Sequence, residues 1–342
     1  MVFHDTLLSE SRAEALPQVV YRPRHATTVT RLMRGQQTHR SRHDAEKGNT
    51  VKLCTFTHQG QTRIGLVEGE EIVDLAVAVP TLPQEMSAFL RAGQPALDAA
   101  RQALTQRAAR LPRSAVWLEA PVQRPGKLLT IGINYKEHAA EAGRETPPHP
   151  PLNFRLATCI NAPYGDMWLP SKSEQFDYEL EFAAVIGRRC RGITRAQVSQ
   201  VVVGYTIFND GSVRDYQRQV NNNLGKSWDT HGPLGPWIVT ADEIPDPHNL
   251  AFQTTVNGAV RQHDNTRNMI HDWETMIEYA STAWTLEPGD VIATGTCSGV
   301  AFGMQPPRWL RVGDVVRMEV EGLGYLENRV VPEPPGTMGF IG

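Results

Sequence analysis

Between residue 127 and about residue 331, the chain carries a succession of short apolar runs that constrains its fold more than any other feature. The runs are rich in Val, Ile, Phe and Tyr and are bounded by turn-forming residues, which is the pattern of buried β-strands. They cover residues 128–133, 179–186, 201–208, 251–256, 291–294 and 315–320. The clearest helical spacing is in residues 271–283, where Trp273, Met276, Ile277 and Ala280 share a face. The sequence therefore predicts an α+β fold that is mostly β, with helices at its periphery.

A smaller pattern precedes this region. Residues 51–75 contain short apolar segments broken by polar, glycine-containing turns, which predicts a small antiparallel meander. Residues 82–111 carry apolar positions at helical spacing. The Pro- and Gly-containing stretch 120–126 then forms a rigid connector. We expect a small N-terminal α+β domain over residues 51–120 and a larger second domain over residues 127–331.

The two ends of the chain lack such patterns. Residues 1–50 are basic and poor in apolar periodicity, so we expect a poorly ordered extension. A transit peptide is an alternative that the acidic residues among the first fifteen disfavour, and translation that starts inside the segment, for instance at Met33, is another. The Pro- and Gly-rich residues 332–342 are expected to form a loose tail.

Composition excludes several classes of protein. Lys and Arg total 34 against 37 Asp and Glu, a net charge of −3, which argues against a general nucleic-acid binder. No apolar run approaches the roughly 20 residues that a membrane-spanning helix needs. The 4 cysteines lie far apart and form no CxxC pair, so we expect reduced thiols and a cytoplasmic protein. A chain of 342 residues is long enough for an enzyme of about two domains.

Acidic residues mark the first candidate site. In the run Asp177-Tyr-Glu-Leu-Glu181, alternate residues of a strand would share a face, so Asp177, Glu179 and Glu181 would project together. Taken alone, such a pattern is more often a solvent-exposed strand face. A further acid, Asp210, follows the apolar strand at residues 201–208. Glu179, Glu181 and Asp210 offer hard oxygen ligands without His or Cys nearby, which favours Mg²⁺, Mn²⁺ or Ca²⁺ over Zn²⁺.

A histidine and a glutamate three residues apart mark the second candidate site. After the strand at residues 128–133, a short helical turn would place His138 and Glu141 on one face. The carboxylate could then orient the imidazole as a general base. The alternative is an exposed histidine in a polar loop. Residues 142–151 pass from flexible to stiff sequence, as expected of a lid or of an ordinary linker.

Taken together and in order, these pieces resemble the fumarylacetoacetate hydrolase family over residues 127–331. Each piece is weak alone, but so many in one order are specific. The resemblance implies a mixed β-roll catalytic domain that binds Mg²⁺, Mn²⁺ or Ca²⁺ and forms homodimers or dimers of dimers. The matching pieces are Gly132-Ile-Asn-Tyr-Lys-Glu-His138 with Glu141, Asp177-Tyr-Glu-Leu-Glu181, Asn209-Asp-Gly-Ser-Val-Arg-Asp215 with Gln217, Gly225-Lys-Ser-Trp-Asp-Thr, Pro233-Leu-Gly-Pro-Trp, Val256-Asn-Gly, Pro288-Gly-Asp-Val-Ile and Thr294-Gly-Thr.

The resemblance also implies roles for individual residues. The metal ligands would be Glu179, Glu181 and Asp210. His138 and Glu141 would activate water, and Lys226 would supply positive charge. The substrate contacts would be Arg155, Gln217 and Thr296. The chain departs from the family pattern at Arg155, where many relatives have Lys, at Cys297, where Pro is common, and at residues 302–309, which look inserted. Taken alone, Arg214 and Asp215 would be a surface ion pair.

The implied chemistry is that of 2-oxo acids with a second carbonyl or enol. We expect a metal-dependent acylpyruvate hydrolase of aromatic-compound catabolism, which would split a fumarylpyruvate- or maleylpyruvate-like substrate into pyruvate and a carboxylic acid. The alternative is a 2-oxo-acid decarboxylase, isomerase or hydratase that uses the same metal-enolate chemistry. A third hypothesis is a ligand-binding protein that keeps the fold without turnover.

Overall fold

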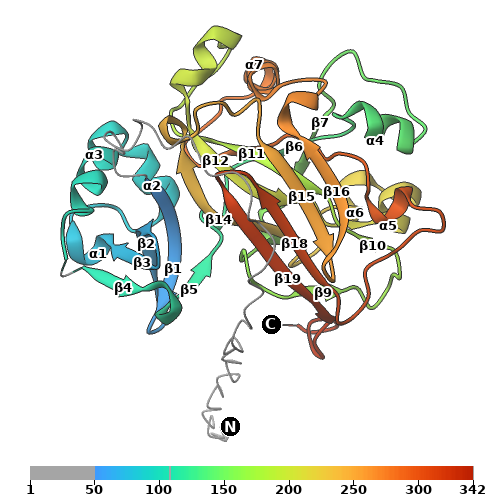
Figure 1. Cartoon of the computed structure of the whole chain (residues 1–342), viewed down its shortest axis with the longest axis horizontal. Helices are drawn as coiled ribbons and strands as arrows, with labels where there is room; N and C mark the ends of the chain where they lie inside the picture. The colour runs from blue at the N-terminus through green and yellow to red at the C-terminus, as the bar shows by residue number, and fades with distance from the viewer. Residues whose placement is uncertain (1–50, 108, 342) are drawn as a thin grey trace, which may run out of the picture. The chain divides into compact units, whose positions relative to one another are not determined.

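The computed structural model describes residues 51–107 and 109–341. These described residues belong to one compact unit (Figure 1). The extension expected over residues 1–50 lies outside the described residues. Within the described residues, strands predominate over helices, so the prediction of a mostly-β α+β fold is confirmed. In this part of the chain, no helix has the length and apolarity required to cross a membrane.

The segment before residue 120 folds as a meander with three short helices. The elements are β1 (Lys52–His58), β2 (Gln61–Glu68), β3 (Glu71–Asp74), α1 (Leu75–Ala78), α2 (Met86–Arg91), α3 (Gln94–Ala103), β4 (Arg110–Pro112) and β5 (Trp117–Glu119). Helix α2 begins where the Glu85 carboxylate accepts hydrogen bonds from the first free backbone N–H groups. Helices α2 and α3 pack buried side chains such as Phe89 and Ala100 into a core with Leu53 of β1.

The remaining elements form the larger part of the structure. The helices are α4 (Lys136–Glu141), α5 (Arg214–Gln219), α6 (Asn222–Gly225) and α7 (Trp273–Ala283). The strands are β6 (Leu128–Ile131), β7 (Leu152–Arg155), β8 (Ile160–Asn161), β9 (Met167–Leu169), β10 (Phe176–Asp177), β11 (Leu180–Ile186), β12 (Val202–Asn209), β13 (Ser212–Val213), β14 (Gly232–Thr240), β15 (Ala251–Val256), β16 (Ala259–Asn265), β17 (Val291–Ala293), β18 (Val315–Val320) and β19 (Gly324–Pro332).

One large mixed sheet runs through the compact unit. Its strand order is β4-β3-β2-β1-β14-β12-β11-β17-β6-β7, with β5 paired to β1 and β8 paired to β14. Because Leu53 of β1 lies opposite Ile238 of β14, the N-terminal meander and the larger region share this sheet. The division into two domains at residues 120–127 therefore remains a proposal, and the two proposed domains are joined by this strand pairing.

A second sheet packs against the first. Its order is β16-β15-β18-β19-β9, and the short strands β10 and β13 pair separately. The main hydrophobic core draws on both sheets and includes Phe182 of β11, Ile207 of β12, Phe252 of β15 and Met318 of β18. Strand β11 is buried along its whole length, which fits its nearly continuous apolar sequence.

The strand directions bring the ends of several strands together on one side of the large sheet, which is called its edge here. Strands β17 and β6 are parallel, so the loops that follow them leave from this same edge. Strand β11 is antiparallel to both β17 and β12, so its beginning lies beside the end of β17 and the end of β12. The backbone N–H of Asp210 accordingly donates to the carbonyl of Glu179 at 2.9 Å. Residues far apart in sequence thus meet at this edge.

Candidate active site

Three carboxylates meet at the edge where β11 begins and β12 ends. Oxygen atoms of Glu179, Glu181 and Asp210 all lie within 4.8 Å of one another, and all three residues are buried. The solvent-exposed strand face that an isolated acidic pattern suggests is therefore not what the chain forms here. The structure brings together the three residues that the sequence nominated as metal ligands.

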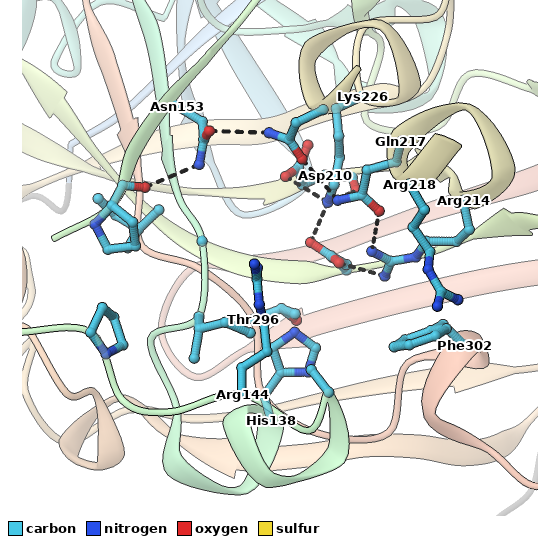
Figure 2. Close-up of a pocket in the computed structure, with 18 of the residues that line it drawn as sticks. His138, Arg144, Asn153, Asp210, Arg214, Gln217, Arg218, Lys226, Thr296 and Phe302 are labelled. Atoms are coloured by element: carbon cyan, nitrogen blue, oxygen red, sulfur yellow. Dashed lines mark hydrogen bonds and ion pairs between the residues drawn. The ribbon is translucent and has the colours of Figure 1, made fainter. Parts of the chain in front are cut away.

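Buried cations partly balance these acids (Figure 2). The Nζ of Lys226 donates to Glu179 Oε2 at 2.6 Å and to Asp210 Oδ2 at 2.9 Å. Arg155 grips Asp210 with two hydrogen bonds, from Nε at 2.7 Å and from Nη2 at 2.6 Å. Arg214 Nη2 donates to Glu179 Oε1 at 2.5 Å. Burial raises the pKa of Glu179, but Lys226 and Arg214 outweigh it and hold the pKa below its ordinary value.

Glu181 is the carboxylate without a cationic partner. Its Oε2 accepts a hydrogen bond from the backbone N–H of Gly295 at 3.0 Å, while its Oε1 is buried and has no partner among the described residues. Burial, followed by the charges of Asp210 and Glu179, raises the pKa of Glu181 well above its ordinary value. A hard divalent cation fits this set, because it would give the orphaned oxygen a partner and supply the missing positive charge.

The candidate base stands across from this cluster. His138 lies on α4, and its Nδ1 is 2.9 Å from Oε2 of Glu141. The other carboxylate oxygen of Glu141 accepts from the backbone N–H of Gly299 at 2.9 Å. With Nδ1 held by Glu141, Nε2 is the ring nitrogen left for a ligand. The isolated motif thus forms an ordered dyad rather than a free loop histidine.

A cavity of about 1060 Å³ joins the dyad to the carboxylate cluster. Its wall includes His138, Glu179, Asp210 and Lys226, together with Arg144 and Pro147 of the segment that the sequence suggested as a lid. The same wall includes Arg155, Gln217 and Thr296. All three expected substrate contacts therefore border the cavity, although each is already engaged within the protein.

Each of these three side chains has hydrogen-bond partners within the protein. Arg155 donates two hydrogen bonds to Asp210, so its guanidinium group holds a carboxylate of the protein itself. Gln217 accepts from Arg214 Nη1 at 2.9 Å and donates to Asn222 Oδ1 at 2.9 Å. The hydroxyl of Thr296 donates to the carbonyl of Leu180 at 2.8 Å and accepts from Gln262 at 2.7 Å.

Sequence reasoning missed the place of Arg214. Taken alone it suggested a surface ion pair with Asp215, but its side chain is buried between Asp177 and Glu179. Asp215 instead accepts a hydrogen bond from Ser173 Oγ at 2.7 Å. Buried acids on the neighbouring strand need a buried cation, and that requirement is the signal that could have identified Arg214.

Asn134 is a second residue that the sequence did not single out. Its side-chain amide donates to the carbonyls of His271 at 2.9 Å and Thr294 at 2.6 Å, and its oxygen accepts from the N–H of His271. The amide thereby ties the loop after β6 to the loop after β17. Both loops carry groups of the site, so Asn134 helps to fix their spacing.

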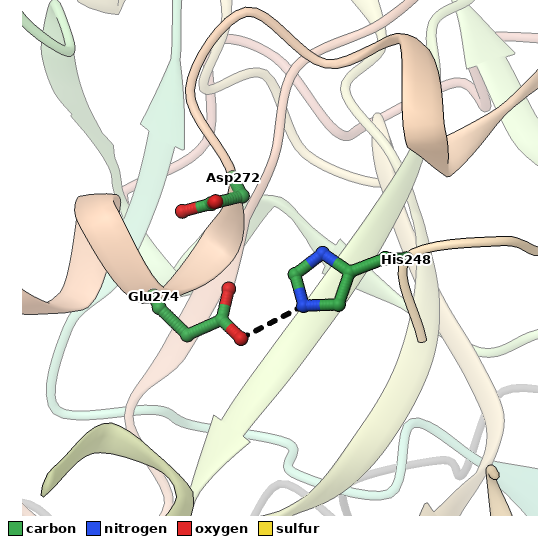
Figure 3. Close-up of side chains that lie close together, drawn as sticks. All are labelled: His248, Asp272 and Glu274. Atoms are coloured by element: carbon green, nitrogen blue, oxygen red, sulfur yellow. Dashed lines mark hydrogen bonds and ion pairs between the residues drawn. The ribbon is translucent and has the colours of Figure 1, made fainter. Parts of the chain in front are cut away.

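A second cluster of potential ligands lies outside the cavity (Figure 3). His248 Nε2 is 2.8 Å from Oε1 of Glu274, and Asp272 lies beside them. Asp272 caps α7 by accepting from the N–H of Thr275 and also pairs with Arg195. These groups are partly exposed, and His248 is held by Glu274 while Asp272 is held by Thr275 and Arg195, so the cluster stabilises the start of α7.

Residues 127–331 match the family described as "Fumarylacetoacetate (FAA) hydrolase C-terminal". The oxaloacetate tautomerase of Rattus norvegicus, named as mitochondrial, is 40% identical over 287 residues, which is 82% of this chain and 92% of the rat protein.

Solved structures of similar proteins agree with this family match. The fumarylacetoacetate hydrolase of Exiguobacterium antarcticum has a TM-score of 0.72 and 35% identity, covering 83% of this chain and 100% of that one. Maleylpyruvate hydrolase from Sphingobium sp. SYK-6, solved with manganese(II) and pyruvate, has a TM-score of 0.69 and 31% identity, with coverage of 83% and 100%. The chain described here belongs to the fumarylacetoacetate hydrolase family.

Proposed function

We propose that this protein is a metal-dependent tautomerase that interconverts the keto and enol forms of a 2-oxo dicarboxylate of the oxaloacetate class. One observation carries the proposal: His138, which Glu141 orients, lines the same cavity as the buried carboxylates Glu179 and Asp210. The relative from rat named as an oxaloacetate tautomerase matches over 82% of the chain and supports this substrate class. Isomerisation was the alternative that the sequence raised, and these observations support it as the first candidate.

The carboxylates Glu179, Glu181 and Asp210 would hold the metal, with Mg²⁺ or Mn²⁺ as the proposed ion and Ca²⁺ as the further option. When bound, such an ion supplies Lewis-acid stabilisation of negative charge on substrate oxygens. The manganese in the structure of the Sphingobium maleylpyruvate hydrolase supports this assignment. Arg155 and Lys226 hold the two oxygens of Asp210 in place by hydrogen bonds.

His138 would carry the proton. In the direction from keto to enol, Nε2 takes a proton from carbon 3 of the substrate. The electron pair of that bond forms the double bond between carbons 2 and 3, while the π pair of the carbonyl at carbon 2 moves onto its oxygen. The proton is then delivered to the oxygen on carbon 2, so the reaction neither gains nor loses atoms. Glu141 accepts a hydrogen bond from Nδ1–H and stabilises the imidazolium during the transfer.

The other predicted residues would position the substrate. The Lys226 ammonium lies between Glu179 and Asp210, where its charge stabilises an enolate oxygen brought to the cluster. Gln217 and Thr296 border the cavity and are proposed to contact the 2-oxo acid group. For Arg155 we propose a role through Asp210 in place of direct substrate contact, because both carboxylate oxygens of Asp210 occupy it.

Acylpyruvate hydrolysis, the reaction first expected from the sequence, is the second candidate. A histidine oriented by a carboxylate is suited to activating water, and the Sphingobium maleylpyruvate hydrolase shares 31% identity over 83% of this chain. In that case Nε2 of His138 deprotonates water, which attacks the carbonyl distal to the 2-oxo acid. The carbon–carbon bond between that carbonyl and carbon 3 then breaks, and the enolate of pyruvate leaves and is protonated at carbon 3. The products would be pyruvate and a carboxylic acid, as in aromatic-compound catabolism.

Product analysis separates these reactions. Purified protein, with Mn²⁺ or Mg²⁺ and with EDTA, is mixed with enol oxaloacetate and with a panel of acylpyruvates, while ultraviolet absorbance and product masses are followed. We expect metal-dependent loss of the enol without a change of mass, and little cleavage of acylpyruvates. Release of pyruvate and an acid would favour the hydrolase, and release of carbon dioxide the decarboxylase. Absence of turnover with every substrate would favour the ligand-binding hypothesis.

Variants connect the reaction to the site. Replacing the base in H138Q should remove more than about 99% of the activity, since general bases contribute roughly 10²–10⁴-fold. E141Q keeps the shape of the orienting group and should cost less, about 10–100-fold. An active H138Q protein would exclude His138 as the base and with it the proposed mechanism.

The assembly proposed from the family resemblance is a homodimer or a dimer of dimers. Strand β7 is an edge of the large sheet, and Phe154 and Leu156 on and after it are exposed by 53% and 60%. Leu224 of the adjacent α6 adds to this apolar surface with 49% exposure. Light scattering of the wild type and of F154E should show a dimer that the charge disrupts.

The cytoplasm remains the proposed compartment. Its support is that Cys54, Cys159, Cys190 and Cys297 are all unpaired thiols, although the rat relative is named as mitochondrial. Fractionation of source cells with an antibody against the described region would show the compartment. Recovery in an organelle fraction would overturn the proposal.

A further inference from the structure

An arginine at the wall of the cavity has a position that the proposed proton transfer leaves unexplained. Arg218 lies on α5 one helical turn after Arg214, so the two side chains project from the same face. Its guanidinium carbon is 4.7 Å from the centroid of the Phe302 ring, and that of Arg214 is 5.7 Å from the same ring. Figure 2 shows both arginines beside Phe302 at one side of the cavity.

The two arginines differ in charge balance. Arg214 is buried and pairs with Asp177 and Glu179, whereas Arg218 is exposed to the cavity. Within residues 51–107 and 109–341, Arg218 forms no ion pair with a carboxylate. Its five N–H donors are therefore available to a ligand, and its positive charge is not neutralised by an acid of this region.

The ring beneath Arg218 is itself held firmly. The backbone N–H groups of Ala301 and Phe302 donate to the two carboxylate oxygens of Asp177 at 2.7 and 3.1 Å. Asp177 in turn accepts from Nε of Arg214 at 2.8 Å. Stacking on a fixed aromatic face restricts the guanidinium before any ligand arrives, and this preorganisation lowers the entropic cost of binding an anion.

We propose that Arg218, supported by Phe302, binds the second carboxylate of the substrate and selects 2-oxo dicarboxylates over 2-oxo monocarboxylates. The inference rests on the proposed function only in assuming that a 2-oxo acid occupies the carboxylate cluster. The 2-oxo acid end would lie at Glu179, which Arg214 contacts, and the distal carboxylate would then reach Arg218 one turn along α5. A planar guanidinium receives a carboxylate with two parallel hydrogen bonds, which accounts for selection by charge and by shape.

Arg144 is the other arginine in the cavity wall without a carboxylate partner among the described residues. It follows Gly143, which has a positive φ of 63°, and its side chain extends past His138 into the cavity (Figure 2). This position is beside the reacting end of the substrate, and the residue lies on a loop with no fixed aromatic support. Arg144 is therefore the natural comparison for Arg218, because both variants remove one positive charge from the same cavity.

The test compares two substrates that differ in the distal group alone, oxaloacetate and its 4-methyl ester. The wild type should prefer the diacid in kcat/KM. In R218Q this preference should fall about 10–100-fold, mainly through a higher KM for the diacid, as expected for loss of a charge-assisted contact. F302L, which keeps Arg218 but removes the ring beside it, should reduce the preference by about 3–5-fold. R144Q should slow the reaction of both substrates alike. R308Q changes an exposed arginine that lies in the same segment as Phe302 but outside the cavity wall, so this variant should retain the preference for the diacid.

Two results would overturn the inference: an unchanged preference in R218Q, or a loss of preference in R144Q alone. Binding of 3,3-dimethyloxaloacetate and of its 4-monoester, measured by calorimetry with Mn²⁺-loaded protein, keeps the proposed function separate. Neither compound can enolise, so tighter binding of the diacid by wild type, lost in R218Q, supports the role of Arg218 even if no tautomerase activity is found. Equal binding of both compounds by wild type would exclude it.

Discussion

Gly303 lies directly against the carboxyl group of Glu141. A Cβ at position 303 would stand 2.1 Å from the carboxyl carbon and from Oε1 of Glu141, far inside contact distance. The same carboxylate bonds His138 Nδ1 and the N–H of Gly299. The turn at residues 301–303 therefore forms one wall of the slot that orients the candidate base.

G303A should consequently move Glu141 and loosen its hold on His138. We expect kcat to fall about 10–100-fold with a small change in KM, because a displacement of about 1 Å of a positioning group costs up to roughly 10²-fold. Steady-state kinetics and thermal melting check the result. E141Q should have a similar effect, and the double variant should be little worse than either single one, since both act on one contact. Fully additive losses would show that Gly303 acts elsewhere.

Two glutamates of the cluster should respond oppositely to the same change. E179Q leaves Lys226 and Arg214 with an uncharged neighbour, so in EDTA it should destabilise the protein by about 3–5 kcal/mol. E181Q removes a buried acid without a cationic partner, so the metal-free stability should stay within about 1 kcal/mol of wild type or rise. Urea unfolding in EDTA measures both.

Metal binding should weaken in both variants. Calorimetric titration with Mn²⁺ measures this binding. Comparing the two variants is informative because the same isosteric change separates a glutamate's effect on stability from its role as a metal ligand. If E179Q and E181Q were equally stable in EDTA, the balance of charges described for the cluster would be incorrect.

R155K distinguishes two roles for Arg155. Lysine keeps the charge but cannot make two parallel hydrogen bonds to Asp210, so the metal-free protein should lose about 1–3 kcal/mol of unfolding free energy. A residue that contacts substrate directly would instead raise KM and leave metal-free stability unchanged. Unfolding curves in EDTA, set beside steady-state kinetics with metal, tell these outcomes apart.

His231 should make the fold sensitive to acid. Burial lowers the pKa of His231 to about 4 from 6.5, against the opposing hydrogen bond to the Trp168 carbonyl. Between these pH values the unfolded chain binds a proton that the folded chain does not, so stability falls as pH drops from 6.5 towards 4. The loss amounts to about 3 kcal/mol. Chemical unfolding at several pH values should give a flatter profile for H231Q, whereas H263Q, which alters an exposed histidine, should follow the wild type.

The parts of the site that follow from local periodicity were predictable. Alternation along a strand predicted that Glu179 and Glu181 lie together, and spacing on a helical turn predicted the contact between His138 and Glu141. Asp210 could be placed at the end of a strand, but its position beside Glu179 depends on the antiparallel pairing of β11 with β12. The family resemblance supplied that juxtaposition.

Other features depend on tertiary contacts that no short pattern encodes. The bidentate bond of Arg155 to Asp210 and the stacking of Arg218 on Phe302 join segments separated by 55 and 84 positions. Strand β14 was not among the predicted strands, because its glycines and prolines are unusual in a central strand. Its burial between β1 and β12 outweighs that local preference.

The parallel pairing of β6 with β17 also bears on how the protein is made. Leu128 lies opposite Val291, so this contact closes a loop of more than 160 residues. The groups that follow β17, among them the N–H that holds Glu181 and the one that holds Glu141, emerge from the ribosome long after the acids they bind. Closing so long a loop is a slow step in folding. We expect the candidate active site to be assembled only after synthesis has passed residue 303, as a late event shared by both halves of the sheet.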